Sequence, residues 1–171
     1  MTSIRLLQSS DLHDVLAWRN HPNVRRFMFT QHEIRPEEHQ QWFEKVRQDS
    51  TRRLLIVEDG KAPLGFVQLS NVEVGGVAGW GFYACPEAPK GSGRKLGQVA
   101  LKYAFEHERL HKLCGQAIET NIASIAFHKS LGFQEEGVLR EHRKIAECYY
   151  NLVCFGLLHH EWSQDNALKD N

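Results

Sequence analysis

The hydrophobic and polar positions of the chain follow two different periods, and each period predicts its own kind of element. Residues 52–59 form a short apolar run between charged ends, which is typical of a buried strand. Residues 36–50 instead place Trp42 and Phe43 on one stripe of a helix that opens with a proline. The predicted elements are a strand at 2–7, a helix between Ser10 and Pro22, a helix at 36–50, strands at 52–59, 60–74 and 75–87, a helix at 96–108, a strand at 112–120, a helix at 121–133 and two strands within 137–162. This order predicts the α/β (α+β) class, with a mixed, mostly antiparallel central sheet of about seven strands flanked by about four helices.

Length and composition indicate one ordinary globular domain. A chain of 171 residues is long enough for one full hydrophobic core and too short for two. We therefore expect a single domain over residues 1–162 and a polar, frayed tail at 163–171. The 21 basic residues balance the 21 acidic ones, so nothing favours nucleic-acid binding. No apolar run is long enough for a leader or a membrane span, and four cysteines without paired spacing favour a reducing, cytoplasmic location.

Residues 89–97, PKGSGRKLG, combine glycines with basic residues just before a predicted helix. The nucleotide-triphosphate loop does not fit, because no register supplies the required spacing of Gly, Lys and Ser or Thr. The dinucleotide fingerprint also fails, since Leu96 stands where its third glycine is needed. Glycines let backbone amides approach a ligand, and a helix N-terminus attracts negative charge. The segment therefore predicts an anion-binding loop, and a plain glycine-rich turn with incidental basic residues is the competing explanation.

Two segments, taken in order, resemble the GCN5-related N-acetyltransferase (GNAT) family over most of the chain. In that family an Arg or Gln, two further residues, a Gly, one residue and a Gly or Ala form the loop that holds the pyrophosphate of coenzyme A. Here Lys90 takes the first place and Gly93 the glycine, while Lys95 departs from the pattern. The second segment, 121–133, is similar to the family's helix that begins with Asn and ends with Gly-Phe. The resemblance implies the GNAT fold, with acetyl-CoA as the acetyl donor and no metal.

The same resemblance implies a donor site and two catalytic candidates. The donor site comprises Lys90, Gly91, Ser92, Gly93, Arg94, Lys95, Asn121 and Phe127. His128 stands where the family commonly has the tyrosine that protonates the departing thiolate, and histidine can also donate a proton near neutral pH. The alternative proton donors to the thiolate are Tyr149, Tyr150 and bulk water. The acceptor amine must be neutral when it attacks, and the candidate bases are Glu119, the nearest carboxylate to the motif in sequence, and a chain of water molecules.

The segment 18–30 mixes aromatic, amide and cationic side chains, which suits a ligand with an aromatic and an anionic part. Together with 37–42 it resembles the GNAT enzymes that acetylate UDP-4-amino-4,6-dideoxy-N-acetyl-beta-L-altrosamine in pseudaminic acid biosynthesis, the pathway that serves flagellin glycosylation. The resemblance implies direct transfer of the acetyl group to the sugar 4-amine in a ternary complex of small-molecule substrates. It also implies an acceptor site made of Arg19, Arg25, Met28, Phe29, His39, Trp42 and Trp80. For any one of the aromatic residues, a place in the core is the competing explanation.

Three other functions fit parts of the sequence. HERLH at 107–111 matches the H-E-x-x-H pattern of zinc peptidases, but it falls where one predicted element ends and the next begins. The segments 137–145 and 157–162 also resemble GNAT enzymes that acetylate the N-terminal amine of ribosomal proteins, although the cationic 18–30 segment argues against a basic substrate. A non-catalytic acyl-CoA sensor is the third, because His128 replaces the family tyrosine. An antiparallel sheet with an aromatic C-terminal strand is also compatible with a homodimer.

Overall fold

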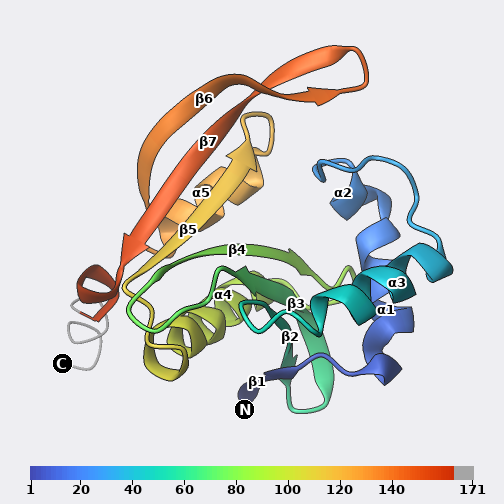
Figure 1. The fold of residues 1–171 in the computed structure, drawn as a ribbon, viewed down its shortest axis with the longest axis horizontal. Helices are drawn as coiled ribbons and strands as arrows, with labels where there is room; N and C mark the ends of the chain where they lie inside the picture. The colour runs from blue at the N-terminus through green and yellow to red at the C-terminus, as the bar shows by residue number, and fades with distance from the viewer. Residues whose placement is uncertain (164–171) are drawn as a thin grey trace.

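The structure, a computed structural model, describes residues 1–163 and confirms the predicted α/β class, with one seven-stranded sheet (Figure 1). Its elements are β1 (Thr2–Leu6), η1 (Ser9–Asp11), α1 (Leu12–Asn20), α2 (Pro22–Arg25), α3 (Pro36–Val46), β2 (Arg53–Asp59), β3 (Ala62–Ser70), β4 (Val77–Ala84), α4 (Ser92–Lys102), η2 (Tyr103–His107), β5 (Lys112–Ile118), α5 (Ile122–Ser130), β6 (Gln134–Ile145) and β7 (Cys148–Leu158). The tail predicted at 163–171 lies outside the described residues except for Ser163.

The sheet consists of two antiparallel groups joined by one parallel pair. Its strand order is β1-β2-β3-β4-β5-β7-β6. β1 to β4 form an antiparallel meander, and β5, β7 and β6 form the second group. β4 and β5 run parallel, and their pairing is limited to 77–79 against 112–114. A parallel pair needs a crossover connection, which α4 and its π-helical extension η2 provide.

The meander is buried on both faces, which explains why β2 reads as a continuous apolar run. Side chains alternate between the two faces of a strand. Leu55 and Val57 belong to the cluster under α4, whereas Leu54 and Ile56 belong to a second cluster under α1 and α3. Full burial of each such side chain contributes about 1.5–3 kcal/mol. None of the helices within residues 1–163 has the length and apolar character that crossing a bilayer requires.

β6 and β7 continue past the end of β5 as a long hairpin that projects from the sheet (Figure 1). Its pairing is irregular between Leu139 and Arg143, so that 140–142 of β6 stand opposite Asn151 of β7 alone. Glu141, inside this bulge, has a left-handed φ of 48°. A bulge bends the strand that contains it and sets the direction of nearby side chains.

The predicted start of α4 is wrong. The helix begins at Ser92 and not at Leu96, because Gly91 adopts a left-handed conformation with φ of 88° and turns the chain directly into the helix. Arg94 and Lys95 therefore belong to the first turn of the helix, where the sequence analysis expected loop residues.

The region before Pro22 also differs from its prediction. The helix predicted between Ser10 and Pro22 begins only at Leu12, since Ser10 lies inside the short 3-10 helix η1. Asp11 stands before α1, and its carboxylate accepts a hydrogen bond from the backbone N–H of Gln8 at 2.8 Å. After Pro22 the chain forms the additional short helix α2.

A buried ion pair ties β2 to the end of the crossover. Glu108 is 8% exposed, and Nε and Nη2 of Arg53 donate to its two carboxylate oxygens at 2.7 and 3.0 Å. Burial raises the pKa of Glu108, but the hydrogen bonds from Arg53 and Tyr103 and the charge of Arg53 together outweigh burial and leave this pKa below its ordinary value.

We expect Arg53→Met to lower the free energy of unfolding by roughly 3 kcal/mol near neutral pH, because Glu108 is left buried without its partner. The double variant Arg53→Met/Glu108→Leu should recover most of this loss, since two apolar side chains then replace both charges. Urea unfolding measures both effects. A single variant as stable as the wild type would show that the ion pair does not hold the crossover.

Candidate active site

β4 and β5 separate after their short paired stretch (Figure 1). A cavity of about 1200 Å³ lies at this separation. Residues 80–84 of β4 keep their pairing with β3, and 115–118 of β5 keep theirs with β7. Beyond Gly79 and Cys114 the facing edges of the two strands have no strand partner, and both edges line the cavity. Free backbone N–H and C=O groups at such an edge can bond an extended ligand that carries amides.

The predicted anion-binding loop lies at one end of this cavity, where α4 begins. Gly91 is the left-handed cap of the helix, and Gly93 lines the cavity. Ser92 is buried, and its backbone N–H donates to the carbonyl of Pro89 at 3.1 Å. The first amides of a helix and the positive end of its dipole favour an anion at this position.

The basic residues of the loop have different surroundings. Lys90 and Arg94 are exposed and have no ion-pair partner within residues 1–163. Lys95 donates to the carboxylate of Asp59 on β2 at 2.6 Å. The structure therefore leaves Lys90 and Arg94 available to an anion and neutralises Lys95.

α5 completes this end of the cavity. Asn121 lines the cavity and caps the helix, since its Oδ1 accepts from the backbone N–H of Ser124 at 3.1 Å. Phe127 also lines the cavity and packs against Phe82 of β4, with ring centres 5.0 Å apart. A Cβ at Gly97 would come within 2.9 Å of the Phe127 ring, so glycine permits the close approach of α4 and α5. Gly93, Asn121 and Phe127 are thus brought together as predicted.

His128 lies at the predicted place on α5, but both of its ring nitrogens are engaged. The residue is 1% exposed. Nε2 accepts a hydrogen bond from the indole N–H of Trp80 at 3.1 Å, and Nδ1 donates to the carbonyl oxygen of Ser124 at 2.8 Å. These partners assign the neutral tautomer with its proton on Nδ1, and burial lowers the pKa of His128. A neutral ring without a free N–H is poorly suited to protonate a thiolate, so the geometry argues against the predicted acid role.

The Trp80–His128 hydrogen bond joins the two walls of the cavity. Trp80 belongs to β4, and His128 belongs to α5, which covers β5. Gly115 of β5 makes the contact possible, because a Cβ there would collide with Nε2 of His128 and lie 2.7 Å from Nε1 of Trp80. The bond therefore links β4 to the helix that covers β5, at a level where β4 and β5 no longer pair with each other.

Glu119 does not face the cavity. It is exposed, and its two carboxylate oxygens accept from the backbone N–H and from Nδ2 of Asn151 at 2.9 and 3.0 Å. Oδ1 of Asn151 in turn accepts from the backbone N–H of Glu141, within the β6 bulge, at 2.8 Å. This position argues against the predicted role as base and gives Glu119 a part in holding the hairpin.

The other end of the cavity is lined by α1, α3 and the α2–α3 loop (residues 26–35). Nη2 of Arg19 donates to the carbonyl oxygen of Thr30 at 3.1 Å, while its Nη1 is buried without a hydrogen-bond partner. The rings of His39 and Trp42 stack, with centres 5.1 Å apart and planes 21° apart. Burial, and then the charge of Arg19, lower the pKa of His39. A cation thus lies beside a flat, neutral aromatic surface.

The α2–α3 loop is held against α1 by one asparagine. Nδ2 of Asn20 donates to the carbonyl oxygen of Ile34 at 2.8 Å, and the N–H of Ile34 donates back to Oδ1 of Asn20 at 2.8 Å. Met28 and Phe29 of this loop line the cavity, as predicted. Of the predicted acceptor residues, five therefore lie at this end, namely Arg19, Met28, Phe29, His39 and Trp42.

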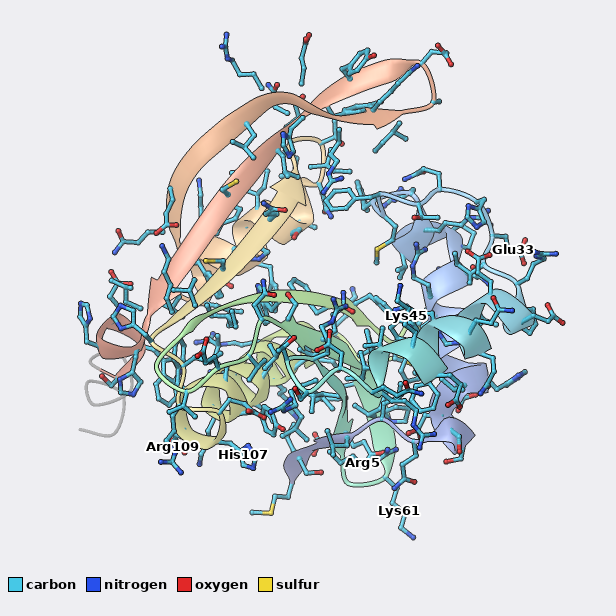
Figure 2. The ribbon with its side chains drawn as sticks, viewed as in Figure 1. Arg5, Glu33, Lys45, Lys61, His107 and Arg109 are labelled. Carbon is cyan, nitrogen blue, oxygen red and sulfur yellow. The ribbon has the colours of Figure 1, made fainter. Side chains whose placement is uncertain are left out.

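Two predicted acceptor residues lie elsewhere. Arg25 does not line the cavity and pairs with Glu33 at 3.6 Å. Figure 2 shows Glu33 on the outer side of the N-terminal helices, away from the hairpin. Trp80 does line the cavity, but its indole N–H is taken by His128 and its ring stacks on Phe133 with centres 5.3 Å apart. Trp80 is therefore a rigid part of the wall.

The sequence analysis missed Tyr83 and Ser124, which both line the cavity. Tyr83 packs against Phe66 with ring centres 5.0 Å apart, and burial raises its pKa. A tyrosine in a strand is typical of a core residue, so no local signal marks it. Side chains alternate along β4, so that Trp80 and Tyr83 lie on opposite faces of the strand. This alternation is the one sequence signal that could have indicated that Tyr83 faces the acceptor end.

The HERLH pattern does not form a metal site in residues 1–163, where no group of three potential ligands is found. His107 is exposed and stacks on Tyr103, with ring centres 4.6 Å apart. Glu108 is bound to Arg53, and the helix has ended before His111. Figure 2 shows His107 at the end of the molecule opposite the hairpin.

The comparisons with known proteins agree on a family. A model of the acetyltransferase (GNAT) domain matches residues 2–134. Acetyltransferase PseH of Campylobacter jejuni subsp. jejuni serotype O:2 is 29% identical over 153 residues, which cover 90% of this chain and 90% of that protein. Acetyltransferase PseH of serotype O:23/36 is 29% identical over 127 residues, or 74% of this chain and 79% of that protein. The crystal structure of Vibrio cholerae spermidine N-acetyltransferase in complex with CoA and spermine superposes with a TM-score of 0.86 at 26% identity, covering 95% of this chain and 98% of that one.

We expect the free energy of unfolding to fall as the pH drops below about 6.5, because burial lowers the pKa of His39 and His128 in the fold. Below that pH the unfolded chain takes up protons that the folded chain does not, so acid favours unfolding. Each histidine contributes at most about 1.4 kcal/mol per pH unit in this window.

Urea unfolding at several pH values measures how the free energy of unfolding changes with pH. His128→Gln retains an acceptor for Trp80 and should remove the part of this pH dependence that His128 causes. His128→Phe should also lower the free energy of unfolding by about 1–3 kcal/mol at every pH, because the Trp80 N–H loses its partner. An unchanged slope in His128→Gln would mean that His128 does not stay neutral in the fold.

Proposed function

Since this chain belongs to the acetyltransferase (GNAT) family and is an acetyl-CoA-dependent N-acetyltransferase, we propose that it acetylates the 4-amine of a UDP-linked 4-amino-4,6-dideoxy sugar. The specific acceptor is UDP-4-amino-4,6-dideoxy-N-acetyl-beta-L-altrosamine, in pseudaminic acid biosynthesis for flagellin glycosylation. The observation that carries this proposal is the arginine beside stacked aromatic rings at the end of the cavity opposite the anion-binding loop. The two PseH relatives, at 29% identity, support the same substrate class.

The donor end fits acetyl-CoA. The start of α4 favours a pyrophosphate, with Gly93 giving its backbone room to approach. The free edges of β4 and β5 offer backbone partners to the two amides of the pantetheine arm. Asn121 and Phe127 flank the same channel. A thioester held there would lie in the gap between the strands and face the acceptor end.

The acceptor end favours an anion. Among the residues that line the cavity, the permanent cations are Arg19 and Arg26, and Glu38 is the one carboxylate. Glu38 is itself bound to His32 at 3.0 Å. A diphosphate suits this excess of positive charge, the stacked rings of His39 and Trp42 suit a base, and Met28 suits a deoxygenated sugar.

The reaction joins the amine nitrogen to the thioester carbonyl carbon and breaks the C–S bond. The amine loses one proton and the departing thiolate gains one. Because His128 and Glu119 are both engaged elsewhere, we assign the proton transfers to water in the open cavity. His128 then acts as a positioning residue that fixes Trp80 in the wall.

Acetylation of a polyamine is the second candidate, because the Vibrio cholerae neighbour was crystallised with CoA and spermine. A polycation needs carboxylates at its site. This cavity offers Glu38 against two arginines, so its charge disfavours a polyamine.

The four cysteines of the chain are free thiols, which agrees with the cytoplasm that we propose as its location. A homodimer stays a prediction, and the free edge of β6 offers one place for a second copy.

We expect thiol release from acetyl-CoA in the presence of the UDP-linked 4-amino sugar, and none with spermidine or with N-terminal peptides of ribosomal proteins. A thiol-reactive dye measures release, and mass spectrometry identifies the product. Thiol release only with spermidine, or only with a peptide, would show that this compound and not the sugar nucleotide is the acceptor. Binding of acetyl-CoA without release in any arm would indicate a sensor.

We expect Arg19→Ala to raise the KM for the sugar nucleotide about tenfold or more, because a charge-assisted hydrogen bond to phosphate contributes about 1.5–3 kcal/mol. The KM for acetyl-CoA should stay the same. Arg25→Ala is the matched control, since Arg25 pairs with Glu33 outside the cavity. If Arg19→Ala and Arg25→Ala changed the KM for the sugar nucleotide equally, Arg19 would not be part of the acceptor site.

A further inference from the structure

Arg143 of the C-terminal hairpin contacts the α2–α3 loop. Its Cζ lies 3.9 Å from the centre of the Phe29 ring. Phe29 lines the cavity, whereas Arg143 comes from β6, on the far side of the gap between β4 and β5, and is not itself a lining residue. It reaches the rim of the cavity by covering the Phe29 ring. In Figure 1 the hairpin and this loop face each other across the open side of the molecule. The contact therefore joins the hairpin to the α2–α3 loop, so that protein surrounds the acceptor end of the cavity.

The bulge in β6 is held by a chain of hydrogen bonds that ends close to Arg143. Glu119 accepts from Asn151 at 2.9 and 3.0 Å, and Asn151 accepts from the backbone N–H of Glu141 at 2.8 Å. Arg143 follows two residues later, where regular pairing with Tyr150 resumes. Bulges are over-represented next to active sites, where they direct a side chain. The bulge thus fixes the part of the strand from which Arg143 extends.

Arg143 has no acidic partner within residues 1–163. Among the described residues its buried Nε finds no hydrogen-bond partner, and the same holds for Nη1 of Arg19. The two guanidinium groups contact consecutive residues of one loop, since Arg143 covers Phe29 and Arg19 binds the carbonyl of Thr30. Buried N–H donors without acceptors cost free energy, and a ligand with anionic oxygens would supply the acceptors.

We propose that Arg143 is a specificity-determining residue of the acceptor site, which binds the phosphates of a nucleoside diphosphate together with Arg19. The proposal rests on the proposed function, because it names a further residue of the same acceptor site. Stacking on Phe29 holds the plane of the guanidinium group and leaves its edge donors for phosphate oxygens. The N-terminal loop and the C-terminal hairpin then both contribute a cation to one ligand.

Calorimetric titration of the full chain with UDP and with uridine tests this assignment. For Arg143→Gln we expect UDP to bind about tenfold more weakly and uridine to bind as in the wild type, because the lost contact is to phosphate. Arg143→Lys should regain part of the UDP affinity, since it keeps the charge but not the fork of donors. Arg140→Gln is the control, because this exposed arginine of the same strand loses the same charge, and UDP should bind within about twofold of the wild type.

The other outcomes separate the alternatives. Equal weakening of UDP and uridine binding by Arg143→Gln would mean that Arg143 only supports the loop, and unchanged UDP binding would remove it from the site. Either result overturns the inference and leaves the proposed function intact, as long as wild-type protein binds UDP. Wild-type protein that binds neither UDP nor uridine would instead overturn the nucleotide acceptor itself.

Discussion

The separation of β4 from β5 after three paired residues is the constraint on which the rest of the structure depends. Backbone groups in a sheet are normally paired, so two strands that part inside a domain must each keep their other neighbour. β3 and β7 fulfil this requirement, and they leave two free edges facing each other. The cavity, the start of α4 at one end and the aromatic rings at the other all follow from that gap. A sheet without the gap would have no place for an extended donor.

A gap of this kind also has to be kept from collapsing or widening, and the Trp80–His128 hydrogen bond crosses it. The histidine ring stacks on Phe155 with centres 4.7 Å apart, beneath β7. In such apolar surroundings a hydrogen bond left unmade costs about 1–3 kcal/mol, so the pair favours a single separation of the walls. This gives the histidine at this position a physical explanation. Histidine, as a neutral acceptor, pairs with an indole that can only donate.

The sequence predicts the order of elements and the two ends of the cavity because these depend on local patterns. The glycine loop, the Asn121 cap and the stripe of α3 are all short-range features. His128 was predicted as the acid because it stands where the family commonly has a tyrosine, and Glu119 was predicted as the base because it is the nearest carboxylate to the motif in sequence. Their actual partners, Trp80 and Asn151, lie 48 and 32 residues away along the chain. Such pairings depend on strand register and on where a bulge falls, which no local pattern encodes.

His128 is engaged in the wall and Glu119 in holding the hairpin, so in the proposed mechanism the rate enhancement comes mainly from placement. Holding two reactants in a reactive geometry lowers a barrier by about 7–11 kcal/mol in favourable cases, without any acid or base from the protein. The cavity suits this under the proposed function, in which each end would hold the phosphates of one substrate and the reacting centre would lie between them. Binding energy from phosphates far from the amine can then orient the amine at the thioester. The contact between the hairpin and the α2–α3 loop matters in this scheme because it joins the two sides of the acceptor end, where the amine has to be held toward the thioester.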